Sequence, residues 1–415
     1  MKIAFVNNTF EPFAVGGAEM SMLARAKGLK ARGHAVKVFT LAADGAATER
    51  DVGGVDVEYV TGRWAAASPF HTDRSKLQKL MWHVGPEWIP GGATDLAGQI
   101  AAFQPDVVNI ANLPGVGFAN IRTLQAAGIR VVMTIADFAP LCAGTTMLRG
   151  GKQCESRCGQ CRIVGGPRLS RFLGADQFVF ISDFMRQSYI KALPQHAHRF
   201  ERAPVIHNGL DEKFLAADSE TPCASASGAN GPLRIGYIGQ LNPNKGVEAL
   251  LQCFAGTPFR QPATLTVAGK GDSAYEAQLK QSVSGRDDVD FVGWANPMAF
   301  FQTVDLVVVP SIWNEPLGRV PYEANYFGRP ALVANRGGLP ELIAPGVNGA
   351  VFDPENLQDF RACLLDWADQ LTQRRSEIAE ASRRHAIDRH HPGSIAARYE
   401  QVFSVQDVSP AEIPC

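Results

Sequence analysis

Short apolar runs alternate with helix-like stretches along most of the chain. The runs are continuous, as expected of strands that are buried on both faces. In the first half they lie at Ile3–Val6, Ala35–Phe39, Val107–Ile110, Val131–Ile135, Phe178–Ile181 and Val205–Ile206. In the second half they lie at Ile235–Ile238, Leu265–Ala268, Val289–Val292, Leu306–Val309, Ala331–Val333 and Ala350–Phe352. Strands separated by helices predict an α/β protein with parallel, doubly wound sheets and helices on both faces.

The composition changes abruptly near the middle of the chain, where small and polar residues dominate. Such a stretch buries too little apolar surface to fold, so we expect a linker over residues 213–232. It separates a Rossmann-like domain at 1–212 from a second one at 233–390, and a helix and tail follow at 391–415. The length agrees, since 415 residues exceed the usual ~100–200 of one domain. Two such domains predict a ligand site in the cleft where they face each other.

The overall composition is that of a globular protein. The shares of 46% hydrophobic and 20% charged residues exclude collagen-like, disordered and disulfide-scaffold classes. No apolar run approaches the ~18–20 residues of a membrane span, and the opening residues do not resemble a secretory leader. We therefore expect a cytoplasmic protein whose eight cysteines stay reduced.

The net charge of −1 conceals a difference between the two halves. Residues 1–212 carry 23 Lys and Arg against 18 Asp and Glu, which is +5, and residues 213–415 carry 17 against 23, which is −6. This imbalance is too small to indicate a nucleic-acid partner. It is either an ordinary solvated face or a peripheral contact with the inner face of a membrane. The basic, tryptophan-bearing stretch Trp64–Ile89 permits the same contact with a bilayer, and core packing is the alternative.

The densest chemical signal follows the fourth predicted strand of the second half. Glu315 and Glu323 stand eight positions apart, and between them lie Leu317, Gly318 and Arg319. The backbone N–H groups of these three residues would lie unpaired at a helix N-terminus, where an anion such as a diphosphate is stabilised. Glu323, two turns into the helix, could then accept hydrogen bonds from a ribose diol, and Glu315 could reach the group beyond the phosphates. A capped helix with two solvated acids is the plainer interpretation.

Other glycine-rich turns end further strands of the second half. Gly239 opens a turn that places Gln240 and Lys245 before the next helix, and a loop lysine commonly neutralises phosphate charge. Similar turns lie at Ala268–Asp272, Phe291–Trp294 and Asn335–Glu341. Each turn alone is a weak signal, but all of them fall at the carboxyl edge of one predicted sheet, where nucleotides bind in folds of this kind.

In their order and spacing these motifs resemble those of the retaining glycosyltransferases of family 4. That family has the GT-B architecture, in which two Rossmann-like domains face each other across a cleft. The resemblance spans Lys2 to about Asp353. The segments that carry it are Gly16–Glu19, Asn208–Asp211, Gly239 to Gly246, Gly269–Gly271, Phe291–Trp294, Glu315 to Glu323 and Gly337 to Glu341.

The resemblance implies a hexosyltransferase-like enzyme that retains the anomeric configuration of its donor and needs neither a metal nor another cofactor for its chemistry. Residues 1–212 would form the acceptor side, and residues 233–390 would bind the nucleotide sugar, UDP- or GDP-linked. The acceptor would be a glycan, a glycolipid or a small glycoside, as in polysaccharide biosynthesis.

The same resemblance implies a role for each site residue. Lys245 would bind the donor diphosphate, and the backbone near Leu317–Arg319 would bind the β-phosphate. Glu323 would contact the ribose and Glu315, a candidate catalytic residue, the transferred sugar. Gly16–Gly17 would lie beside the leaving phosphate or the acceptor. Electrostatic stabilisation of the departing diphosphate would then be the main catalytic effect.

Two positions depart from the family pattern. Gln240 stands where an arginine is usual, so one phosphate contact is either missing or supplied by Arg319 or Arg336. Ala136 precedes Asp137 where a histidine is usual, which leaves the donor sugar and the rate of catalysis open. Asp137 remains a candidate catalytic residue, and a turn-capping aspartate is the alternative.

Four of the eight cysteines, Cys142, Cys154, Cys158 and Cys161, fall within twenty residues. This glycine-rich insertion at about 142–161 could bring four thiolates to one structural zinc ion, or to an iron–sulfur cluster. Reduced cysteines without a metal are the alternative. Some members of the resembled family carry a similar cysteine-bearing insertion, and we expect it to shape acceptor recognition.

Two other functions fit parts of this pattern. A nucleotide-sugar epimerase of the same architecture would change the donor without any acceptor. A nucleotide-binding homologue with weak catalysis would keep the donor pocket, and Ala136 and Gln240 are the features that favour it. The ordered motifs favour glycosyl transfer.

Overall fold

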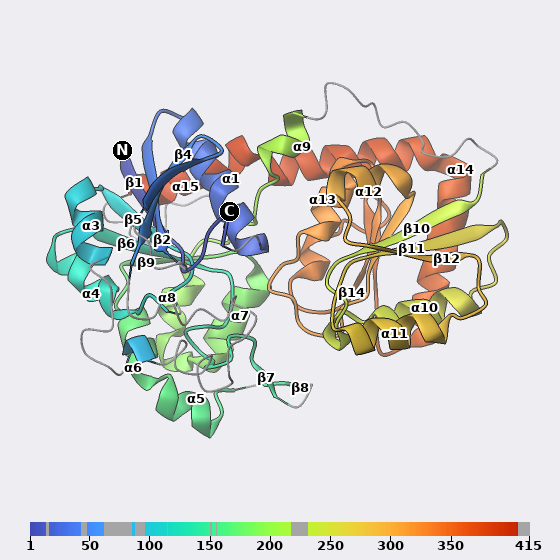
Figure 1. The fold of residues 1–415 in the computed structure, drawn as a ribbon, viewed down its shortest axis with the longest axis horizontal. Helices are drawn as coiled ribbons and strands as arrows, with labels where there is room; N and C mark the ends of the chain where they lie inside the picture. The colour runs from blue at the N-terminus through green and yellow to red at the C-terminus, as the bar shows by residue number, and fades with distance from the viewer. Residues whose placement is uncertain are drawn as a thin grey trace. The chain divides into compact units, whose positions relative to one another are not determined.

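A computed structural model describes residues 1–13, 16–42, 48–61, 85–87, 96–113, 115–149, 152–154, 156–216 and 231–405 (Figure 1). The chain divides into two compact units. Unit 1 consists of Met1–Asp211 and Pro392–Cys415, and unit 2 consists of Glu212–His391. The C-terminal segment therefore returns to the N-terminal unit. Nearly all of the stretch Trp64–Ile89 and most of the expected linker lie outside the described residues.

A seven-stranded sheet forms the centre of unit 1, in the order β3-β4-β2-β1-β5-β6-β9. Neighbouring strands are parallel except for the antiparallel pair β3 and β4. Most strands are apolar and buried, which explains why the sequence predicts them. The strands are β1 (Lys2–Val6), β2 (Ala35–Leu41), β3 (Thr48–Val52), β4 (Val55–Val60), β5 (Val107–Ile110), β6 (Arg130–Ile135) and β9 (Gln177–Phe180).

In unit 1 helices follow most of the strands. After β6 the chain first forms a small hairpin of β7 (Leu148–Arg149) and β8 (Lys152–Gln153). Val205, expected in a strand, makes only an isolated bridge to Phe180. The helices are α1 (Gly17–Ala31), α3 (Leu96–Phe103), α4 (Ala119–Ala126), α5 (Gly159–Val164), α6 (Gly166–Phe172), α7 (Asp183–Ala192), η2 (Pro194–His196), α8 (Ala197–Glu201) and α15 (Pro392–Ser404). The last of these packs against α1, where a Cβ at Gly28 would lie 2.9 Å from the Cβ of Ala396.

The sheet of unit 2 has six parallel strands in the order β12-β11-β10-β13-β14-β15. This is the order of a doubly wound nucleotide-binding sheet. The strands are β10 (Leu233–Ile238), β11 (Ala263–Ala268), β12 (Val289–Gly293), β13 (Leu306–Val309), β14 (Ala331–Ala334) and β15 (Gly349–Phe352). The helices are α9 (Glu212–Ala216), η4 (Pro243–Lys245), α10 (Val247–Gly256), α11 (Ser273–Ser282), α12 (Pro297–Thr303), α13 (Val320–Tyr326), η5 (Leu339–Leu342) and α14 (Leu357–His390).

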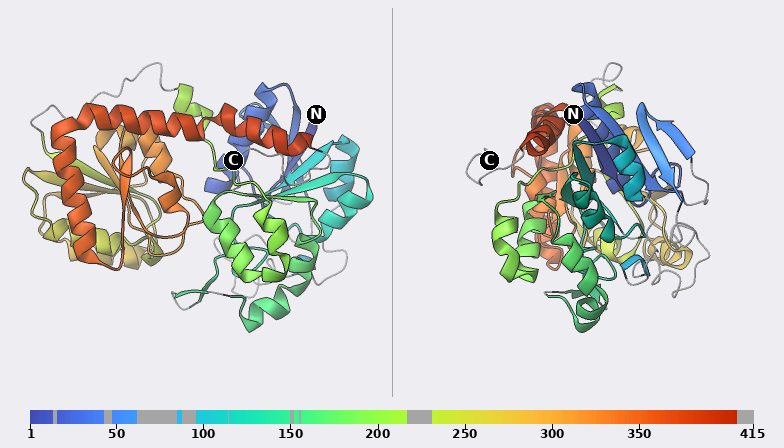
Figure 2. Two further views of the ribbon diagram at one scale, coloured as in Figure 1. Left: turned by 180° about the vertical axis from the view of Figure 1, so that it is seen from behind. Right: turned by 90° about the vertical axis from the view of Figure 1, so that its left-hand side faces the viewer.

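Alternate residues of β13 enter different cores, so this sheet is covered on both faces. Leu306 and Val308 belong to the core that contains Trp367 of α14, whereas Val307 belongs to the core that contains Phe300 and Ala324. Helix α14 bends at Arg374, whose φ of −142° and ψ of 40° are not helical (Figure 2).

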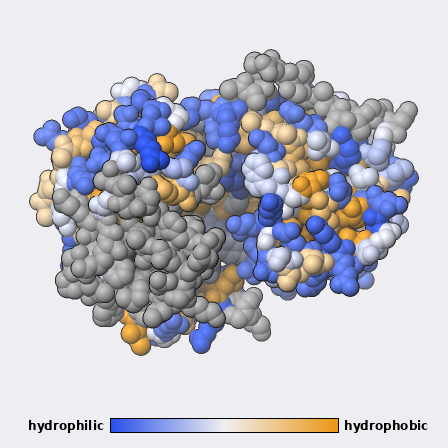
Figure 3. Space-filling view, viewed as in Figure 1, coloured by the Kyte–Doolittle hydropathy of each residue, from blue (hydrophilic) through white to orange (hydrophobic). Residues whose placement is uncertain are grey.

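The described surface carries few large apolar side chains. Apolar and polar residues are interspersed on the face shown in Figure 3. The most exposed large apolar residues are Ile163 and Trp294, which are 73% and 72% exposed. None of the described helices has both the length and the apolar character that crossing a membrane requires.

Candidate functional site

The loops at the carboxyl edge of the unit 2 sheet approach each other more closely than side chains would permit. A Cβ at Gly269 would lie 1.8 Å from the carbonyl oxygen of Gly239. A Cβ at Gly271 would lie 1.7 Å from the carbonyl oxygen of Leu241. The glycines of the predicted turns therefore allow the loops after β10 and β11 to stack backbone against backbone.

A further glycine joins the loops after β10 and β13. Gly246 has a φ of +70°, and a Cβ there would lie 1.9 Å from the carbonyl oxygen of Pro310. The backbone N–H of Ile312 donates to the carbonyl oxygen of Asn244 at 3.0 Å. These contacts hold Lys245, the residue between Asn244 and Gly246, against the loop that carries Glu315.

Lys245 and Glu315 form the centre of the candidate donor site. The Lys245 Nζ lies 2.5 Å from Glu315 Oε1, which also accepts a hydrogen bond of 2.8 Å from the Ser311 hydroxyl. Lys245 Nζ lies 5.6 Å from the centre of the Trp313 ring. The lysine side chain is 24% exposed and the glutamate side chain 11%. The pair is thus largely enclosed, and the lysine side chain is its more exposed member.

The loop after β14 fixes the backbone of Glu315. Gly338 N–H donates to the Glu315 carbonyl oxygen at 2.8 Å, and Gly337 N–H donates to Asn314 Oδ1 at 3.1 Å. A Cβ at Gly337 would lie 2.5 Å from Glu315 N and 2.1 Å from its carbonyl oxygen. Glycine is therefore required at position 337 for the loop after β14 to pack against the Glu315 backbone.

The structure corrects the expected environment of Glu323. Helix α13 begins at Val320, so Glu323 lies in its first turn and not two turns along it. Its Oε1 accepts a hydrogen bond of 2.8 Å from Arg319 Nε, and the residue is only 6% exposed. The i, i+4 spacing on one helical face explains the ion pair. Leu317 is buried, and Gly318 has a φ of +87°.

Gln240, which stands at the position of the usual arginine, has an exposed side chain that accepts a 3.4 Å hydrogen bond from Asn242 Nδ2. Its carbonyl oxygen accepts a hydrogen bond from the Tyr237 hydroxyl at 2.8 Å. Burial and the nearby Glu315 carboxylate raise the pKa of Tyr237. Arg336, the other proposed substitute, pairs with Glu355. Because its pKa is raised, the Tyr237 hydroxyl stays protonated and donates its hydrogen bond to the loop after β10.

Unit 1 places its candidate residues at the carboxyl edge of its own sheet. Gly16 and Gly17 begin α1 after β1, and a Cβ at Gly16 would lie 2.7 Å from Glu19 Oε2. Asp137 follows β6, which is two strands from β1. Neighbouring strands in a sheet are about 4.8 Å apart, so β1 and β6, the strands that precede these two segments, are separated by roughly 10 Å.

Asp137 lies in a small pocket lined by Thr134 of β6 and by residues that follow β5 and β6, among them Asn112 and Pro140. Its Oδ1 accepts a hydrogen bond of 2.8 Å from Ala139 N–H. Burial raises the pKa of Asp137 to about 6, although the Ala139 hydrogen bond and the Arg168 guanidinium oppose the rise. The carboxyl group therefore changes its charge near neutral pH.

The four clustered cysteines are all free thiols in unit 1. Cys142 and Cys161 are buried, and Cys154 and Cys158 are partly exposed. Across the part of the chain that the structure describes, no three histidine, cysteine, aspartate or glutamate side chains are placed to hold a metal ion.

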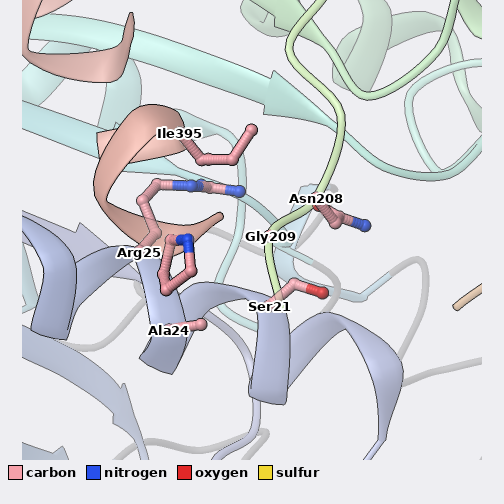
Figure 4. A pocket seen from close by; sticks show the side chains of 7 residues that line it. Ser21, Ala24, Arg25, Asn208, Gly209 and Ile395 are labelled. Atoms are coloured by element: carbon pink, nitrogen blue, oxygen red, sulfur yellow. The ribbon is translucent and has the colours of Figure 1, made fainter. Parts of the chain in front are cut away.

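Several residues near the predicted sites were not identified from the sequence. Ser311 and Trp313 contact the Lys245–Glu315 pair, and their only sequence signal is their place directly after β13. Arg25 lines a second pocket of unit 1, beside Asn208 and Gly209 of a motif that the sequence did single out (Figure 4).

The comparison with protein families assigns both halves of the chain. Residues 15–214 match the family described as Glycosyltransferase Family 4, and residues 225–385 match the family described as Glycosyl transferases group 1. The chain is a GT-B glycosyltransferase. The predicted fold of two Rossmann-like domains is confirmed, and glycosyl transfer from a nucleotide sugar, not epimerisation, is its reaction class.

Some proteins similar to this glycosyltransferase are distant in sequence but extend over most of the chain. An uncharacterized 42.6 kDa protein in the cps region of Klebsiella pneumoniae is 25% identical over 362 residues, which are 87% of this chain and 91% of that protein. HepE of Anabaena, solved with UDP and glucose, has a TM-score of 0.65 and 21% identity, covering 97% of this chain and 99% of that one. Sucrose-phosphate synthase of Thermosynechococcus elongatus has a TM-score of 0.70 and 17% identity, covering 97% and 98%.

Proposed function

We propose that this glycosyltransferase is a retaining enzyme of family 4. It moves a hexose from a UDP-linked donor to a hydroxyl group of a growing polysaccharide or glycolipid. The observation that carries the donor site is the contact between Lys245 and Glu315 at the carboxyl edge of the unit 2 sheet. A UDP-linked donor is supported by HepE, a protein of similar fold that binds UDP. A polysaccharide is chosen because the Klebsiella relative is encoded in a cps region.

Lys245 is proposed to bind the diphosphate of the donor. Its side chain is the more exposed member of the pair, and Glu315 is also held by Ser311, so we expect phosphate oxygens to bind on the lysine side. Arg319, which lies at the N-terminal end of α13, adds a second positive charge, and the backbone from Leu317 to Arg319 faces the β-phosphate. With these cationic groups the leaving diphosphate needs no metal ion for its stabilisation.

Glu315 is proposed to contact the transferred sugar, and Asp137 to accept a hydrogen bond from the acceptor hydroxyl. In the transfer, the bond between the sugar C1 and the β-phosphate oxygen breaks, and the acceptor oxygen bonds to C1 on the same face. The acceptor proton passes to the departing phosphate oxygen. Gly16–Gly17, at the start of α1, are proposed to lie beside the leaving phosphate or the acceptor. Glu323 is proposed to reach a ribose hydroxyl through the carboxylate oxygen that Arg319 does not occupy.

The proposal is tested with purified protein and a panel of UDP-, GDP- and ADP-sugars. A thermal-shift screen first identifies the nucleotide, because a ligand that binds only the folded state raises the melting temperature. Transfer to lipid-linked or oligosaccharide acceptors is then followed, and the anomeric proton of the product is read by NMR. We expect UDP to stabilise and the product to keep the donor configuration. An inverted product would refute retention, and stabilisation by GDP alone would refute the UDP donor.

A peripheral contact with the inner face of a membrane is proposed for unit 1. Residues 149–202 carry ten Lys and Arg, of which Arg168 is buried, against four acidic residues, and this excess of positive charge favours binding to anionic lipid surfaces. Sedimentation with vesicles of phosphatidylglycerol should retain the protein at low salt and release it at high salt. Equal behaviour with neutral vesicles would contradict an electrostatic contact.

A further inference from the structure

The small pocket beside Asp137 lies between the ends of two neighbouring strands of unit 1. Strands β5 and β6 pair in parallel as far as Ile110 and Met133, and the residues that follow each strand line the pocket. Its empty space is about 220 Å³, its open mouth included. Sites that enclose a whole ligand usually measure roughly 300–1,000 Å³. The pocket can therefore take one edge of a sugar but not an entire sugar ring.

Few polar side chains line this pocket. They are Asn112, Thr134 and Asp137, and the other lining residues are apolar. The Thr134 hydroxyl is already engaged, because it accepts hydrogen bonds from Asn109 Nδ2 at 3.0 Å and from Arg25 Nη1 at 3.3 Å. Asn112 and Asp137 are thus the lining residues whose side chains are left to meet a ligand.

The side-chain oxygen of Asn112 is unsatisfied. Its Oδ1 is buried and accepts no hydrogen bond from any residue of the described ranges. Most buried amide oxygens in proteins do have a donor, and leaving one without a donor lowers the stability of the fold. Asn112 therefore carries an acceptor atom that the fold itself does not use.

The backbone on either side of Asn112 is fixed. Ala111 N–H donates to the carbonyl oxygen of the last residue of β1 at 3.0 Å. Leu113 is buried, and its carbonyl oxygen accepts hydrogen bonds of 2.9 Å from the N–H groups of both Val116 and Gly117. The asparagine side chain is consequently held in a defined position beside the pocket.

The turn that carries Asp137 is fixed as well. The Tyr189 hydroxyl donates to the Asp137 carbonyl oxygen at 2.9 Å, and Arg168 Nη1 donates to the Ala139 carbonyl oxygen at 2.8 Å. Both sides of the pocket are thus ordered before a ligand arrives, which reduces the entropy lost on binding.

We propose that this pocket binds one edge of the acceptor sugar and that Asn112 selects for a hydroxyl group there. This hydroxyl would donate a hydrogen bond to Asn112 Oδ1, while the hydroxyl that becomes glycosylated lies at Asp137. Sugars carry hydroxyl groups on adjacent carbons, so one sugar can supply both. The inference rests on the proposed function, because it adds a second contact to the same substrate. A site built around such a hydrogen bond discriminates strongly against an acceptor that lacks the hydroxyl.

The test uses the full-length protein, its UDP-sugar donor, and methyl glycosides of glucose, galactose and mannose as acceptors. Asn112→Ala should raise KM for the glycoside roughly tenfold and leave KM for the donor unchanged. Deoxy glycosides then locate the hydroxyl, because the analogue that lacks it should have a similar KM with the wild type and the variant.

Two failures of this test have different meanings. An unchanged KM for the glycoside, or a rise confined to the donor, would overturn the inference and leave the proposed function intact. Wild-type protein that neither binds UDP nor transfers sugar to any glycoside would refute the proposed function itself.

Stability gives a second readout that needs no acceptor. Asn112→Leu removes the unsatisfied oxygen at nearly constant size, so its melting temperature should equal or exceed that of the wild type. Asn120→Leu is the matched control, because Asn120 is buried and its Nδ2 donates to the carbonyl oxygens of Val116 and Gly117 at 3.1 and 3.0 Å. The control should melt at a lower temperature. A lower melting temperature for Asn112→Leu would show that its oxygen has a structural partner, such as a bound water, and would overturn the inference.

Discussion

Glu315 is held from three directions, by Lys245, by Ser311 and through its backbone by Gly338. Such a residue is positioned before substrate arrives, as a catalytic group requires. Glu315→Gln keeps the size and one acceptor oxygen but removes the negative charge. We expect kcat to fall by roughly 10²–10³, in the range seen when one positioned electrostatic group is removed, with UDP affinity nearly unchanged. Steady-state kinetics together with calorimetric UDP binding would show this, and an unchanged kcat would contradict the role.

Asp137 should make both activity and stability depend on pH. Its pKa rises from 3.8 to about 6 on folding, so the folded state binds the proton more tightly. The contribution of Asp137 to folding therefore becomes unfavourable as the pH increases from 3.8 to about 6, and the loss is complete above that range. If the ionised carboxylate accepts a hydrogen bond from the hydroxyl group of the acceptor substrate, activity should decrease as the pH falls, with a midpoint near 6.

The matched variant for this prediction is Asp137→Asn, which keeps the oxygen that accepts the Ala139 hydrogen bond. Relative to wild type, its free energy of unfolding should rise with pH between 4 and 7, because only the wild type must bury a charge. Denaturant unfolding at several pH values measures the difference. A difference that does not vary with pH would show that the carboxyl pKa is not raised by folding.

At the scale of elements, glycine contacts between neighbouring loops determine the shape of the proposed donor site. Gly337 has a φ of +61° and no room for a Cβ, whereas Gly346 has a φ of +76° and nothing within 4 Å of a Cβ. At either position alanine would have to adopt a left-handed backbone conformation, which costs about 1–2 kcal/mol. Gly337→Ala must also displace the Glu315 backbone, so it should lower both activity and melting temperature more than Gly346→Ala. Equal activity of the two variants would show that the loop after β14 does not position Glu315.

Helix α15 is attached to unit 1 by a buried arginine. Arg25 Nη1 donates to Asn109 Oδ1 at 2.9 Å, and its guanidinium lies 4.1 Å from the centre of the Tyr399 ring. Burial lowers the pKa of Arg25, and no carboxylate among the described residues forms an ion pair with it. Arg25→Ala removes these contacts and leaves a cavity, so we expect a loss of about 2–4 kcal/mol in the free energy of unfolding.

The control for this change is Arg122→Ala, at an exposed position of α4. Hydrogen exchange should increase in α15 of the Arg25 variant and remain unchanged in the Arg122 variant. If both variants unfold like the wild type, the packing of Tyr399 on Arg25 contributes little to the attachment of the helix.

Sequence patterns predicted most buried strands because each is a continuous apolar run. They did not predict β3, whose sequence Thr-Glu-Arg-Asp-Val is polar and which lies at the sheet edge. They also missed α14, whose apolar residues are spread over 34 positions with a bend at Arg374. For the site, strand ends and glycine turns predicted that Lys245 and Glu315 share one edge. The pairing of Glu323 with Arg319 depends on where α13 begins, which the sequence placed too early.

At the scale of the whole molecule, we propose that unit 2 binds the diphosphate of a nucleotide sugar through Lys245. The direct measurement is calorimetric titration of UDP into the wild type, Lys245→Ala and Lys280→Ala. Lys280 is an exposed lysine of α11 and serves as the control. A charge-assisted contact is worth about 1.5–3 kcal/mol, so Lys245→Ala should weaken binding roughly 10- to 100-fold. Lys280→Ala should bind UDP like the wild type. Equal affinities of all three proteins for UDP would show that Lys245 does not bind the diphosphate.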